Sequence, residues 1–69
     1  MMTDAQLHNL ISKLKDEGIS FKYIALISNV DYNTFYAYRK SKHYPIYVRP
    51  IIENAIRNRF GDMIDELSE

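Results

Sequence analysis

The stretch Phe21–Lys40, FKYIALISNVDYNTFYAYRK, decides the fold that we expect of this chain. Ser20, directly before it, and Asp31, inside it, are residue types that cap helices, because their side-chain oxygens accept from free backbone N–H groups. Between the two caps stands Asn29, which tolerates a positive φ better than most residues other than glycine. The stretch therefore predicts two short helices joined by a tight turn, with the second running from Asp31 to about Ser41.

The apolar residues of this stretch are placed so that the two helices lock against each other. Ala25 is a small side chain on the first helix, where a second helix can cross it closely. Val30 and Phe35 have the spacing of a hydrophobic staple across the Asp31 cap. Helical periodicity turns Phe35 and Tyr38 inward and leaves the opposite side of the helix in solvent. The residues expected on that outer side are Tyr32, Asn33, Tyr36, Ala37 and Lys40.

A further helix is predicted before this pair, over Thr3–Glu17. Leucine and isoleucine recur there at the i, i+3, i+4, i+7 spacing of one buried stripe. Thr3 and Gln6 have the spacing of a capping box, and Gly18 suits a left-handed residue at the helix end. The residues of the stripe are Leu7, Leu10, Ile11 and Leu14.

The segment Ser41–Arg49 is predicted to be a loop or a short extended piece. It contains Pro45, and the residue before a proline avoids the α-helical region. Pro50 suits the first position of a fourth helix, because a proline there gives up no hydrogen bond. The buried side of this helix is expected to carry Ile52, Ala55, Ile56 and Phe60.

The end of the fourth helix leaves two alternatives. Gly61 is a residue type that ends helices, and Asp62 can cap a last short helix that presents Met63, Ile64 and Leu67. Alternatively, a single helix bends through Gly61, because the apolar period continues across it. The first interpretation gives about five helices.

With these elements in place, the chain resembles the Cro and C-repressor-like helix-turn-helix family of phages and bacteria. The family spacing is an alanine, a glycine four positions on, an apolar residue next and another apolar residue five positions beyond. The corresponding residues here are Ala25, Asn29, Val30 and Phe35. The resemblance extends from Thr3 to Leu67 and implies an all-α, lambda-repressor-like bundle around a central helix-turn-helix.

The resemblance implies a sequence-specific regulator of transcription, a repressor in the simplest case, that binds double-stranded DNA. Its recognition helix, residues 31–41, would lie in the major groove. The residues implied to read bases are Tyr32, Asn33, Tyr36 and Ala37. Those implied to hold phosphates are Ser20, Lys22, Thr34, Arg39, Lys40 and Lys42. Among the readers, Asn33 can pair bidentately with adenine, and the tyrosines can offer a hydroxyl or contact a thymine methyl group.

The charges of the chain sum to zero but are distributed unevenly. Between Tyr32 and Arg59, six bases stand against a single acid, Glu53. The acids of the C-terminal stretch are Asp62, Asp65, Glu66 and Glu69. The positive charge lies in and after the expected recognition helix, where it would attract phosphate. The same pattern also fits an ordinary solvated helix face.

A different class of function, protein binding, fits the tyrosine content. Six tyrosines occur in 69 residues, and tyrosine is enriched at interface hot spots. Tyr32, Tyr36, Tyr44 and Tyr47 would form one patch if the loop lay beside the recognition helix. The alternative function is therefore a small phage inhibitor or adaptor of a host protein. The discriminating observation is whether the first two tyrosines stand exposed beside basic side chains or merge with the other two.

Size and composition argue against other classes of function. A chain of 69 residues makes one domain, residues 1–69, and buries roughly 60% of its unfolded surface. It has no cysteine, and hence no disulfide and no thiolate metal site. Asp4 and His8 share a helix face, but two ligands are too few for zinc, and His43 falls in another element. We expect no enzyme, no catalytic residue, no metal and no cofactor.

The remaining expectations concern partners and cellular place. The apolar runs are far shorter than a membrane span, and the start of the chain lacks the basic-then-apolar pattern of a signal peptide. We expect a cytoplasmic protein of a bacterial cell or a phage-infected host, with no membrane and no small-molecule substrate. One such domain makes few base contacts, so a homodimer on a palindromic site is expected, formed through Ser41–Arg49 or the last helix.

Overall fold

Four α-helices make up the part of the chain that the computed structural model describes, residues 2–67 with side chains up to residue 63. No β-strand occurs within those residues, which confirms the all-α class. The helices are α1 (Asp4–Asp16), α2 (Phe21–Ile27), α3 (Tyr32–Ser41) and α4 (Arg49–Leu67). In the same range, no helix combines the length and the apolar character that crossing a membrane requires.

Side-chain caps start the first three helices where the sequence predicts them. The Thr3 hydroxyl accepts from the Gln6 N–H at 3.2 Å, and the Gln6 amide oxygen accepts from the Thr3 N–H at 3.0 Å, which completes the capping box. The Ser20 hydroxyl accepts from the Tyr23 N–H at 3.1 Å. The Asp31 carboxylate accepts from two N–H groups at the start of α3, at 3.0 and 3.3 Å. Each cap contributes about 1 kcal/mol, so local chemistry decides where these helices begin.

Left-handed residues follow the first three helices. Gly18 after α1 has a φ of 93° and Asn29 after α2 has a φ of 55°, as the sequence predicts. Lys42 after α3, with a φ of 59°, is a third such residue, and its residue type did not predict this conformation. A side chain in this conformation costs about 1–2 kcal/mol, so α3 ends under local strain.

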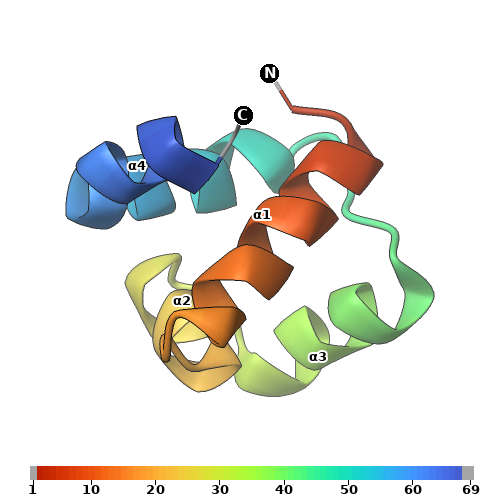
Figure 1. Cartoon of the computed structure of the whole chain (residues 1–69). Coiled ribbons are helices and arrows are strands. Elements are labelled where there is room, and N and C mark those ends of the chain that lie inside the picture. The colour runs from red at the N-terminus through yellow and green to blue at the C-terminus, as the bar shows by residue number, and fades with distance from the viewer. Residues whose placement is uncertain (1, 68–69) are drawn as a thin grey trace.

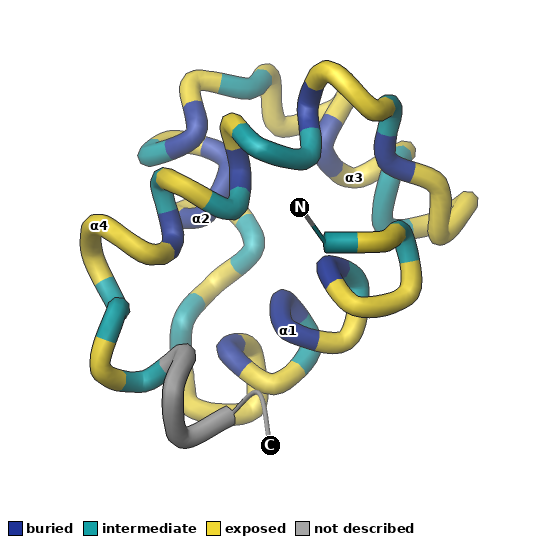
Figure 2. The backbone as a smooth tube through the Cα atoms, turned by 90° about the horizontal axis from the view of Figure 1, so that it is seen from above, coloured by how far each residue is buried: buried dark blue, intermediate teal, exposed yellow. Residues whose placement is uncertain are grey.

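The core gathers around α1, which runs between α4 on one side and α3 on the other (Figure 1). The predicted stripe of α1 is buried along its whole length, and buried segments of the other helices face it (Figure 2). The buried apolar residues are Leu7, Leu10, Ile11, Leu14, Ile24, Ala25, Phe35, Tyr44, Val48, Ile52 and Ile56. This arrangement leaves the outer side of α3 away from the core.

The C-terminal helix corrects the expected count of about five helices. α4 continues through Gly61 as one helix with a kink at Phe60, whose φ of −133° and ψ of 32° are not helical. The bending alternative is therefore the right one. Phe60 and Met63, on either side of the glycine, both pack against the core, so apolar burial continues across it. The helix begins at Arg49, one residue before the expected Pro50.

The predicted inner side of α4 is confirmed in its central turns. Ile52 and Ile56 are buried, and Ala55 is half-buried. Ile64 and Leu67, which the expected last helix would present to the core, lie outside the residues whose side chains are described. The burial of Ile52 and Ile56 is enough to fix which side of α4 faces α1 and α2.

The segment between α3 and α4 is irregular, as predicted, but it contributes to the core. The Pro45 carbonyl accepts from the Val48 and Arg49 N–H groups at 2.9 and 3.2 Å, which makes a tight turn. The side chains of Tyr44 and Val48 are 0% and 5% exposed. The segment is therefore an anchored connection that holds the end of α3 against α1.

Candidate functional site

α3 has an inner side in the core and an outer side in solvent. Phe35 is fully buried, and Tyr38 and Arg39 are half-buried. The exposed residues of the helix include Tyr32, Asn33, Thr34, Tyr36, Ala37 and Lys40. All the residues expected to read bases therefore lie on exposed turns of one helix.

The guanidinium of Arg39 lies against α1. Its Nη1 donates to the His8 carbonyl at 2.9 Å and to the Tyr44 hydroxyl at 3.1 Å, and lies 3.0 Å from Nδ1 of His8. Its Nη2 donates to the Ser12 hydroxyl at 2.7 Å. The guanidinium carbon sits 4.6 Å from the centre of the Phe21 ring, a cation–π contact. These contacts tie α3 to α1, to α2 and to the following loop.

This arrangement argues against the expectation that Arg39 holds a DNA phosphate. Both terminal nitrogens are hydrogen-bonded inside the fold, and Nε is buried without a partner among the described residues. Turning the side chain outward would break these bonds to His8 and Ser12. In the sequence, Arg39 and Lys40 look like one basic cluster, but the helix turns them to different sides.

Nδ1 of His8 serves as a hydrogen-bond acceptor. It lies 3.1 Å from the Tyr44 hydroxyl and 3.0 Å from Nη1 of Arg39, a group that can only donate. Burial, followed by the charges of Arg39 and Lys42, lowers the pKa of His8 below its ordinary value of 6.5. Burial likewise raises the pKa of the Tyr44 hydroxyl, which keeps its proton available for donation. A neutral histidine therefore completes the inner attachment of α3.

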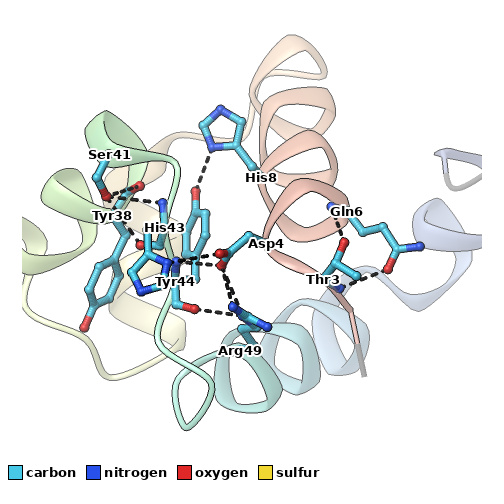
Figure 3. Close-up of polar contacts among 9 residues, drawn as sticks. All are labelled: Thr3, Asp4, Gln6, His8, Tyr38, Ser41, His43, Tyr44 and Arg49. Carbon is cyan, nitrogen blue, oxygen red and sulfur yellow. Dashed lines mark hydrogen bonds and ion pairs between the residues drawn. The ribbon is translucent and has the colours of Figure 1, made fainter.

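Asp4 ties the start of α1 to the loop after α3 (Figure 3). Its carboxylate accepts from the Tyr44 N–H at 2.8 Å and from Nδ1 of His43 at 3.1 Å, and pairs with Arg49 at 2.9 Å. The Tyr44 N–H bond is the main influence that lowers the pKa of Asp4, with His43 and Arg49 adding to it. Asp4 and His8 thus serve two separate clusters. Among the described residues, no three His, Cys, Asp or Glu side chains gather as a metal site requires.

The outer side of α3 carries two neighbouring aromatic rings. The ring centroids of Tyr32 and Tyr36 are 6.2 Å apart, and the residues are 42% and 52% exposed. Asn33 gives its backbone N–H to Asp31. Its carboxamide, like the Lys40 ammonium, has no hydrogen-bond partner in the described part of the chain. The face therefore presents rings, one amide and one ammonium to solvent.

Of the residues expected to hold phosphate, all except Arg39 are exposed. Lys22 lies on α2, Lys40 on the last turn of α3, and Lys42 directly after it. Thr34 lies in the first turn of α3, while the Ser20 hydroxyl oxygen already caps α2. The lysines therefore supply the charge that surrounds the outer side of α3.

The alternative patch of four tyrosines does not form. Tyr44 is fully buried, and its hydroxyl belongs to the Arg39 cluster. Tyr47, in the loop, is 71% exposed. A signal for the burial of Tyr44 was present in the sequence, because the four-residue spacing of the buried side of α4 runs back into the loop. The buried residues at that spacing are Tyr44, Val48, Ile52 and Ile56.

A pocket of about 410 Å³ opens between α2 and the start of α3. Its mostly apolar lining consists of Ser20, Lys22, Tyr23, Ala25, Leu26, Val30 and Tyr32. Leu26 is 74% exposed, and the Tyr23 hydroxyl accepts from Arg59 of α4 at 3.1 Å. Through Tyr32, this pocket continues the exposed aromatic surface of α3 onto α2.

Comparison of the chain with known protein families, with curated proteins and with solved structures found no match.

Proposed function

We propose that this protein is a helix-turn-helix regulator of transcription that binds double-stranded DNA, with α3 in the major groove. The observation that carries the proposal is that α3 is fastened to the fold on one side and exposed on the other. Phe35 and Arg39 fasten its inner side, while Tyr32, Asn33 and Tyr36 are exposed on its outer side. A major groove admits a whole helix, and reading needs base-facing side chains that are clear of the fold.

The connection between α2 and α3 supports the proposed motif. Only Ser28–Asp31 separates the two helices, the length typical of a helix-turn-helix. Asn29 takes the left-handed conformation in this turn, and the Val30 N–H donates to the Ala25 carbonyl at 3.0 Å. Ala25 is 1% exposed, so the small side chain lies under the crossing.

The charges around α3 also support the proposal. Lys22, Lys40 and Lys42 are exposed and can reach phosphates, which contribute most of the sequence-independent affinity for DNA. Asp31 is the acid at the start of α3. Its carboxylate accepts from two helix N–H groups, where the helix dipole favours a negative charge. The acid therefore has a structural role as a helix cap, and the helix dipole offsets part of its negative charge.

The test is fluorescence anisotropy of the protein on a pool of random-sequence duplexes, repeated over a range of salt concentrations. We expect saturable binding that weakens as salt rises. Lys40→Ala should weaken binding to all sequences and lower the salt slope by about one. Arg57→Ala is the control, because it also removes one positive charge, on α4 and outside the proposed DNA-binding motif. Figure 1 shows α2 and α3, which form that motif, and α4. Absence of binding even at low salt would contradict the proposal.

A protein partner is the second candidate function. It is favoured by three exposed apolar side chains, Leu26, Ile46 and Tyr47, at 74%, 67% and 71%. The burial of Tyr44 removes one member of the patch on which this alternative was first based. DNA binding is therefore the first proposal. Absence of duplex binding would make a protein partner the favoured function.

We further propose that two copies act together on a palindromic site, because one recognition helix makes few base contacts. Light scattering with and without DNA tests this proposal. A dimer in either condition would support it. A monomer alone, at high concentration and on a palindromic duplex, would contradict it.

A further inference from the structure

The turns of α3 that would enter the groove first carry no basic side chain. The basic residues of the helix, Arg39 and Lys40, both lie in its last turn. Guanine is most often read by arginine or lysine, which donate two hydrogen bonds to its O6 and N7 atoms. Arg39 is committed to α1 and Lys40 lies in the last turn, so the first turns of the outer side of α3 carry no guanine reader of this kind.

The same turns carry the groups that suit A·T pairs. Asn33 presents a carboxamide, which matches the N6 and N7 atoms of adenine. Tyr32, Tyr36 and Ala37 present apolar surface, which suits the thymine C5-methyl group. These four residues are all exposed, so none needs to leave the core to make such a contact.

The ring pair itself is preformed for an apolar contact. The planes of Tyr32 and Tyr36 are inclined by 35° and their centroids are 6.2 Å apart, so the two rings form one surface. Neither hydroxyl has a hydrogen-bond partner in the described part of the chain. Lys22 lines the same pocket as Tyr32, and Lys40 lies one turn after Tyr36 on α3. Their positive charge complements a phosphate backbone better than an apolar protein surface.

We infer that this protein prefers A·T-rich sites, in which thymine methyl groups pack against the Tyr32–Tyr36 ring pair and Asn33 pairs with adenine. The inference rests on the proposed DNA binding and names the bases that the same face reads. It assigns the specificity to ring carbon atoms more than to the tyrosine hydroxyls.

The experiment begins with selection of preferred duplexes from the random pool. We expect an A·T-rich core. Each thymine of the selected site is then replaced by uracil, which keeps base pairing and the O4 acceptor and removes only the methyl group. Burial of one such carbon predicts about a fourfold loss of affinity for each contacted methyl group. Thymines outside the contact should show no effect.

Protein variants assign the methyl effect to the rings. In Tyr36→Ala, the uracil substitution at the contacted position should no longer change affinity. Tyr36→Phe keeps the ring and should retain the fourfold effect of one methyl group. Ile51→Ala is the control, because Ile51 is an exposed apolar side chain that lies on α4. A thermal melt followed by circular dichroism verifies that each variant is folded, and the exposure of Tyr36 predicts that it is.

The outcomes separate this inference from the function on which it rests. A G·C-rich selected site, or a site whose affinity ignores uracil, overturns the inference and leaves DNA binding intact. Loss of the methyl effect in Tyr36→Phe also overturns it, because the hydroxyl would then be the reader. Absence of binding to any duplex at low salt overturns the proposed function and the inference together.

Discussion

The inner side of α3 is held by contacts within the fold and the outer side is exposed, although both sides carry basic and aromatic residues. On the inner side, Phe35 is buried and Arg39 donates to His8 and Ser12 of α1. On the outer side, Lys40 is exposed. Successive residues of a helix are turned by about 100°, so these two adjacent bases point in different directions. The comparison teaches that a basic residue of this protein acts by its position around the helix more than by its type.

The largest expected effect, on the free energy of unfolding, comes from removing the hydrogen bonds of the inner side. Arg39→Met keeps much of the side-chain volume but removes the charged hydrogen bonds to the His8 carbonyl and the Ser12 hydroxyl. We expect a loss of about 2–3 kcal/mol in the free energy of unfolding, measured by urea denaturation. Lys40→Met on the outer side should change it by no more than about 0.5 kcal/mol. Equal losses in the two variants would contradict the distinction between the two sides.

The next effect tests the outer side. Asn33→Ala should cost about 1–3 kcal/mol of binding free energy on the preferred site, because a bidentate contact with adenine is lost. Affinity for random duplexes and the free energy of unfolding should stay close to those of the unchanged protein. Asn54→Ala is the control, since Asn54 is an exposed asparagine of α4. An unchanged site preference in Asn33→Ala would show that another residue reads the base.

A smaller effect on the free energy of unfolding is expected at Lys42, the residue directly after α3. Its φ of 59° favours glycine, and Lys42→Gly should therefore raise the free energy of unfolding by about 1 kcal/mol. The same change removes a charge and should lower the salt slope of DNA binding. Lys42→Ala separates the two effects, because it removes the charge and keeps the strain. A stability gain in the alanine variant would refute the backbone explanation.

The smallest effect is the pH dependence of the inner side, because His8 is only partly buried. The pKa of His8 is lowered in the folded protein, so the unfolded chain binds the proton more readily. Its contribution to stability is present above the ordinary value of 6.5 and is lost as the pH falls through the folded pKa. The pKa of Asp4 is lowered from 3.8, so its contribution falls away only in more acidic solution.

Urea denaturation between pH 8 and pH 5 measures this effect. His8→Gln should flatten the change of unfolding free energy over that interval. His43→Gln is the matched histidine variant and should retain the part that belongs to His8. A His8→Gln protein with the unchanged pH profile would show that Nδ1 of His8 does not need to be unprotonated in the fold.

Much of the fold was predictable, because helix caps and turns depend on neighbouring residues. Thr3, Ser20 and Asp31 cap helices through hydrogen bonds to residues no more than three positions away. The α1 stripe follows from the helical period. The sequence left two alternatives open at the end of α4, since glycine permits both a break and a continued helix. The outer side of α3 was predictable from local sequence too, because the helical period places its residues on the side opposite the buried Phe35.

The sequence by itself therefore determined where the first three helices begin, which side of each is apolar and which residues of α3 face solvent. Only the tertiary structure decided that Arg39 turns inward and that Asp4 holds the loop. The Arg39 bond to Ser12 joins residues 27 positions apart, and the Asp4 bond to Tyr44 joins residues 40 positions apart. The physical reason is that a hydrogen bond to water and one within the protein differ little in free energy. The residue type alone therefore does not show which of the two a polar side chain makes, and the fold decides by bringing a partner to it.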